Sequence, residues 1–113
     1  MAADPRLPGL QRVAGLVKDM ALADLRRAEA ERAALLQQMA TLSERPTPPE
    51  DLAPAIAEDI ALRYDRWAEL RRREVEQAWR VKSAECDRLR AKARIALGRN
   101  SAVASLADRI TQK

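Results

Sequence analysis

Few side chains in this 113-residue sequence could perform covalent or metal chemistry. There is no histidine, Cys86 is the single cysteine, and the three glycines stand apart from one another. These omissions leave no histidine or cysteine cluster for a metal, no nucleophile with a histidine base, and no glycine-rich phosphate loop. We therefore expect a protein that is not an enzyme, with no catalytic residue, cofactor or metal. We interpret Cys86 as a small apolar filler.

The remaining chemistry is recognition of an acidic partner by basic side chains around a tryptophan. Residues 63–99 include twelve basic and six acidic side chains. Trp79 has Val75, Lys82 and Cys86 as its neighbours along a helix, and a half-exposed tryptophan among arginines can anchor an interface. The alternative is a solvated charged face, whose polarity the helix dipole explains in part. The candidate protein-binding residues are Arg66, Arg71, Arg72, Arg73, Trp79 and Arg80.

Two long helices are expected to position these residues. The stretches 10–42 and 55–97 lack proline and are dominated by Ala, Leu, Arg, Glu and Gln, which are strong helix formers. A proline-dense segment separates them, and a connection of about ten residues is long enough to reverse the chain. A charged fraction of 34% without phenylalanine is typical of coiled coils. We predict an all-α fold, an antiparallel two-helix coiled-coil hairpin with a short C-terminal helical tail.

The expected parts are a flexible leader at 1–9, a first long helix at 10–43, a proline-rich turn at 44–54, a second long helix at 55–97, and a flexible or short helical tail at 98–113. The start of the second helix falls between 48 and 54. Thr47 opens a capping-box pattern, whereas Asp51 or Ala53 would be the cap if Pro54 lies in the first turn. Gly98 is expected to end the second helix in a left-handed cap.

Apolar spacing predicts which faces meet. The expected core of the first helix is Leu10, Val13, Val17, Ala21, Leu25, Ala28, Leu35, Met39 and Leu42. The second helix opens with an apolar stripe, Ile56, Ile60, Tyr64 and Trp67. Its first three residues are expected to face Leu35, Met39 and Leu42, and Trp67 is expected to complete the stripe in the core. It continues as a seam of mostly small residues, Val75, Ala78, Trp79, Lys82, Cys86, Leu89, Ala93 and Ala96. Because the second helix is predicted to be longer, residues 89–97 should project past the first helix and offer a surface for a partner.

Location and nucleic-acid binding can also be judged from composition. The N-terminus does not resemble a signal peptide, and no apolar run reaches the length of a membrane span. One cysteine is compatible with a reducing compartment, so we expect a cytoplasmic protein without membrane insertion. A pI near 9.8 permits nucleic-acid binding. That alternative is less favoured because acids are interleaved with the basic residues and no aromatic stacking platform is present.

The segment 66–80, RWAELRRREVEQAWR, followed by the small-residue tail at 98–107, resembles the FliJ family of flagellar type III export proteins and the similar YscO-like proteins of injectisomes. This chain is shorter than is usual in that family, and its turn is richer in proline. The resemblance implies a stalk that inserts into the pore of a hexameric export ATPase and links it to the export gate or to substrate chaperones. Such a protein would lie in the cytoplasm, peripheral to the export apparatus.

The competing interpretation is a structural adaptor that associates with itself. In that case Ile56, Ile60, Tyr64 and Trp67 would form the contact between copies. The stalk interpretation predicts a monomeric hairpin, and the adaptor interpretation predicts a dimer or a bundle. Oligomeric state therefore discriminates between them.

Overall fold

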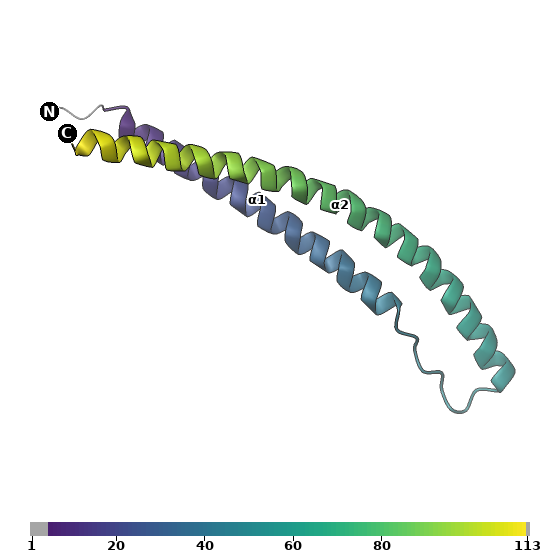
Figure 1. Cartoon of the computed structure of the whole chain (residues 1–113). Helices are drawn as coiled ribbons and strands as arrows, with labels where there is room; N and C mark the ends of the chain where they lie inside the picture. The colour runs from purple at the N-terminus through teal and green to yellow at the C-terminus, as the bar shows by residue number, and fades with distance from the viewer. Residues whose placement is uncertain (1–4, 113) are drawn as a thin grey trace. The chain divides into compact units, whose positions relative to one another are not determined.

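The computed structural model describes residues 5–112, and these residues form two long α-helices without any strand. Helix α1 spans Leu7–Leu42 and helix α2 spans Pro54–Thr111 (Figure 1). The two helices pack against each other, so the all-α prediction is confirmed. Residues 1–4 of the expected leader and residue 113 of the expected tail lie outside the described residues.

The chain divides into two compact units. Unit 1 consists of the described residues of Met1–Glu29 and Ala84–Lys113, and unit 2 is Ala30–Ser83. Each unit therefore contains one part of α1 and one part of α2.

Small side chains form the core of unit 1. Ala21 packs with Ala93 and Ala96, whereas Ala28 packs with Cys86 and Leu89. Residue numbers fall along α2 as they rise along α1, so the two helices are antiparallel here, and they lie side by side in Figure 1. Small side chains allow helix axes to approach closely, but each buries only a few carbon atoms.

The helices of unit 2 are also antiparallel, and polar contacts join them. Val75 and Ala68 are the buried apolar residues of this unit, while Leu35 and Met39 are half-buried. The Lys82 ammonium lies 2.6 Å from a Glu31 carboxylate oxygen across the helix pair. Farther toward the turn, Arg72 Nη2 donates to the Leu42 carbonyl at 3.3 Å. Unit 2 therefore depends less on apolar burial than unit 1.

The expected core of the first helix is partly wrong. Leu10, Val13 and Val17 are exposed, and Leu7 is buried in their place. Ala14 is half-buried in this part of the helix. Leu7, Ala14, Ala21 and Ala28 are spaced by seven and continue one face of α1, whereas Leu10, Val13 and Val17 lie on a neighbouring face. Two overlapping apolar faces account for the successive steps of four from Val13 through Val17 and Ala21 to Leu25.

The expected pairing of the helices is also wrong in register. The Leu42 carbonyl accepts a hydrogen bond from Arg72, which lies two turns of α2 beyond the expected Tyr64. Ile56, Ile60 and Trp67 are exposed. The expected projection of residues 89–97 does not occur, because Leu89, Ala93 and Ala96 are buried against α1. The first turns of α2 lie instead against the proline-rich segment, where the Tyr64 hydroxyl donates to the Glu44 carbonyl at 3.0 Å.

The predicted start of the second helix is confirmed. The Ala53 carbonyl accepts hydrogen bonds from Ile56 and Ala57, both at 3.0 Å, and Pro54 occupies the first turn. Helix α1 begins at Leu7, three residues earlier than expected, because Pro8 also falls in a first turn, where its missing N–H costs nothing.

The expected end of the second helix at Gly98 is wrong, and no separate tail follows. Helix α2 continues through Gly98 to Thr111, and no described glycine has a positive φ angle. Glycine inside a helix costs about 1 kcal/mol relative to alanine. Beyond it Val103 is half-buried and Ala107 is buried, and this packing offsets the cost.

Replacing Gly98 by alanine should stabilise the protein by about 0.5–1 kcal/mol, because a methyl group there meets no atom within 4 Å and the helix gains propensity. Thermal unfolding followed by circular dichroism would measure the change. The reverse substitution at the exposed Ala104, Ala104→Gly, should destabilise by a similar amount. A loss of stability in Gly98→Ala would instead mean that Gly98 ends the helix in a left-handed conformation.

Candidate protein-binding site

The six predicted binding residues all lie on α2 within unit 2. The five arginines are exposed and Trp79 is half-buried. Arg71, Arg72 and Arg73 are consecutive, so they point about 100° apart around the helix and cannot share one face. The structure therefore brings the six residues into one stretch of helix without joining them in a single surface.

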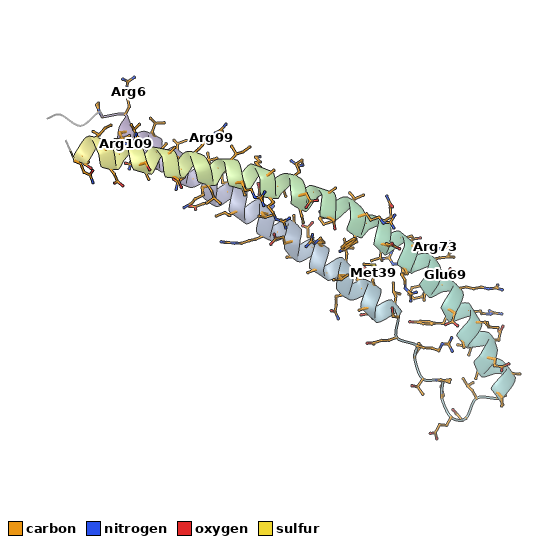
Figure 2. The ribbon with its side chains drawn as sticks, in the orientation of Figure 1. Arg6, Met39, Glu69, Arg73, Arg99 and Arg109 are labelled. Carbon is orange, nitrogen blue, oxygen red and sulfur yellow. The ribbon has the colours of Figure 1, made fainter. Side chains whose placement is uncertain are left out.

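Three of these arginines pair with acids on their own helix. Arg71 lies 3.1 Å from Glu74, and Arg80 lies 2.8 Å from Glu76. Arg73 lies 2.8 Å from Glu69, one turn away. Both residues are labelled on α2 in Figure 2. Exposed pairs of this kind contribute only about 0.3–0.5 kcal/mol. Arg71, Arg73 and Arg80 can therefore exchange their partners for an external carboxylate at small cost.

Arg72 has a structural contact that sequence reasoning missed. Its Nη2 donates to the Leu42 carbonyl and, at 3.4 Å, to the Ser43 hydroxyl. The last carbonyls of a helix have no partner within the helix, and an arginine can satisfy one of them. Arg72 thus caps the end of α1. Arg66, by contrast, forms no ion pair with any residue that the structure describes.

Trp67 is the exposed tryptophan, although the sequence pattern placed it in the core. It is 55% exposed, and its ring centroid lies 5.8 Å from that of Tyr64. A spacing of four, three, four and three connects Ile56, Ile60, Arg63, Trp67 and Leu70, and the arginine at its centre was the signal of a solvent-facing stripe. We call Ile56, Ile60, Trp67 and Leu70 the α2 seam.

A matching exposed stripe runs along the first turns of α1. Leu10, Val13, Val17 and Met20 are spaced by three, four and three, and all four are exposed. We call these four residues the α1 seam. Both seams are largely exposed, although Val17 lies beside Ala96 of α2 and Ile60 lies beside the proline-rich segment.

A groove lies beside the α1 seam in unit 1. Its two adjoining parts share Val17, Ala96 and Arg99, and the larger part encloses about 400 Å³. The lining is Leu10, Val13, Ala14, Val17, Met20, Ala21, Asp24, Lys92, Ile95, Ala96, Arg99, Ala102 and Val103. We call this feature the unit 1 groove. Its lining carries two basic side chains, Lys92 and Arg99, and one acidic side chain, Asp24.

The predicted basic surface around the candidate arginines does not coincide with the most basic part of the chain. Unit 2 contains nine basic and ten acidic residues, so the candidate arginines belong to a nearly neutral part of the chain. Residues 88–107 contain five basic residues and no acid, whereas residues 46–62 contain four acids and no basic residue. The strongest positive and negative blocks therefore lie in unit 1 and unit 2 respectively.

Among the described residues no group of acids and cysteine is arranged to hold a metal ion. No helix in that part of the chain is long and apolar enough to cross a membrane. Comparison of the chain with protein families, with curated proteins and with solved structures finds no match.

Loss of the Arg72 cap should loosen the end of α1. In Arg72→Ala, amide hydrogen exchange at residues 39–44 should become about two- to fivefold faster, which corresponds to a lost contact of about 0.5–1 kcal/mol. Arg66→Ala is the matched control, because Arg66 contacts no helix end, and exchange should stay at the wild-type rate. Equal exchange in both variants would show that the Arg72 contacts do not hold α1.

Proposed function

We propose that this chain is a non-enzymatic helical adaptor that acts by binding proteins through side chains that its two helices leave exposed. One observation carries the proposal. Sixteen large apolar side chains are exposed among the described residues, whereas six of the ten buried apolar residues are alanine. Monomeric proteins rarely leave large contiguous apolar patches in water, and such patches mark interaction sites.

The exposed area supports the same proposal. An unfolded chain of 12.6 kDa exposes about 18,000 Å², and an average globular monomer of that mass exposes about 6,200 Å². This chain leaves 8939 Å² exposed. Folding therefore buries about half of the unfolded surface, where domains of this size bury about two thirds. A partner would supply the burial that the chain lacks.

The specific form of the proposal follows from the resemblance to the FliJ and YscO-like proteins. In this form the chain is a cytoplasmic stalk, peripheral to a flagellar or type III export apparatus, which docks on a hexameric export ATPase ring and links it to the gate or to chaperones. Long helices with exposed charges of both signs support this form, because weak polar contacts can hold such a helix pair within a ring. It needs no small-molecule substrate, no cofactor, and no nucleic acid.

The stalk form can be tested with the export ATPase of the same organism. The variant Arg66→Glu/Arg73→Glu should weaken binding roughly tenfold and reduce any stimulation of ATP hydrolysis. The reason is that two exposed positive charges, which would attract an acidic partner, become negative. Arg72 is left unchanged, since it caps α1. Raised salt should weaken the wild-type complex by screening.

The matched control is Arg12→Glu/Arg26→Glu, which makes the same change of net charge at exposed positions of α1 in unit 1. Circular dichroism of both variants checks that they remain helical. If the two double variants bind the ATPase equally well, the arginines of α2 are only a solvated face and the stalk form is wrong.

A second form, self-association, is favoured by the exposure of the α2 seam. Ile56, Ile60 and Trp67 were the residues expected to join copies of the chain, and about half of each lies in solvent. Tyr64 is half-buried and its hydroxyl is already bonded to the turn. The native mass in solution distinguishes this form from a monomeric stalk.

A further inference from the structure

We propose that the unit 1 groove receives one amphipathic helix of a different protein, and that an acidic edge of this helix meets Arg99. The inference rests on the adaptor function proposed above and specifies the surface and the chemistry of the partner. Every residue that lines the groove lies in unit 1.

The groove is long enough for a short helix. Along α1 its lining runs from Leu10 to Asp24, which corresponds to about 20 Å, or four helical turns. Three alanines also line it, the half-buried Ala14 and the buried Ala21 and Ala96. Their small side chains let another backbone approach closely. A partner helix of about four turns therefore fits along the groove.

The α1 seam supplies an apolar wall. Its steps of three, four and three are those with which the side chains of one helix fit between the side chains of another. Met20 is the most exposed member at 67%, and Ile95, on the opposite side of the groove, is 56% exposed. A docked amphipathic helix would remove these side chains from water, with anchors of its own at the same spacing.

The α2 side of the groove carries positive charge. Arg88, Lys92, Ile95, Arg99 and Ala102 follow one another by four, three, four and three residues, so they share one face of α2, and all are exposed. None of the three cations on this face forms an ion pair with a described residue. Residues 88–107 contain no acid that could neutralise them from the same helix.

Asp24 fixes where an acidic group of the partner would lie. It lines the same part of the groove as Lys92, so the two opposite charges offset each other at that end. Arg99, labelled on α2 in Figure 2, lines both parts of the groove, and Asp24 does not reach the second part. The uncompensated positive charge is therefore central. An acid in the middle of the partner helix, with apolar residues one turn to either side, complements it.

The same charge disfavours a second copy of this chain as the occupant. Two grooves laid face to face would bring two basic faces together. The α2 seam of another copy has Arg63 at its centre, so it would bring a cation to Arg99. Because like charges across an interface are destabilising, the favoured occupant is an acidic helix of another protein.

Two synthetic helical peptides test the proposal on the full chain. Each is about eighteen residues long, with leucines spaced by three and four residues; one carries glutamate beside the leucines and the other carries lysine. In a fluorescence anisotropy titration, the glutamate peptide should bind at least about tenfold more tightly than the lysine peptide, and raised salt should reduce the difference.

Matched variants assign the binding to the groove. Arg99→Glu should abolish the preference for the glutamate peptide, whereas Arg94→Glu should retain it, because Arg94 is exposed but does not line the groove. Val17→Gln should weaken binding of the glutamate peptide about tenfold through the loss of an apolar contact. Leu16→Gln is its control, since Leu16 is 57% exposed and lies outside the groove lining. Circular dichroism checks that all four variants remain helical.

Three results would overturn the proposal. The first is equal affinity for the two peptides, or no binding of either at millimolar concentration. The second is an equal effect of Arg99→Glu and Arg94→Glu. The third comes from sedimentation of the chain alone: a dimer that Val17→Gln dissociates and Leu16→Gln does not would place a second copy in the groove. The adaptor function itself is decided separately, by the ATPase-binding test of Arg66 and Arg73 in unit 2.

Discussion

The close packing of alanine and cysteine side chains between α1 and α2 is the constraint on which the rest of this structure depends. In unit 1, Ala21, Ala28, Cys86, Ala93 and Ala96 occupy the positions where a conventional coiled coil carries leucine or isoleucine. Such a seam lets the helices approach closely, but it removes little apolar area from water. Many of the larger apolar residues are left exposed, where no described part of the chain covers them.

Each helix accordingly carries two apolar faces, one used within the chain and one left open. The open faces lie at different places, the α1 seam in unit 1 and the α2 seam in unit 2. Charge is segregated in the same way, with acids near the start of α2 and basic residues toward its end. A partner that covered these exposed faces would meet helices with both apolar and charged side chains, so its binding would be sensitive to salt.

The sequence was sufficient to predict the helices, the antiparallel direction seen in both units, and the small-residue seam around Cys86. It could not predict the register, because local spacing assigned Leu10 and Trp67 to the core equally well and only the paired helix decides between two overlapping faces. Gly98 was expected to end α2 because glycine is a common helix terminator, but packing beyond it outweighs that propensity. The role of Arg72 was invisible because its partner, the end of α1, is thirty residues away in the sequence.

The central claim, that small side chains pair α1 and α2 within one chain, is tested most directly by a cysteine beside Cys86. Ala28 packs with Cys86, so the variant Ala28→Cys should form an intramolecular disulfide on oxidation at high dilution. Mass spectrometry of the digested protein would identify the linked peptides, with Ala28→Cys/Cys86→Ser as the control. The account predicts an oxidised monomer in which residues 28 and 86 are joined. Disulfides formed only between chains at that dilution would contradict it.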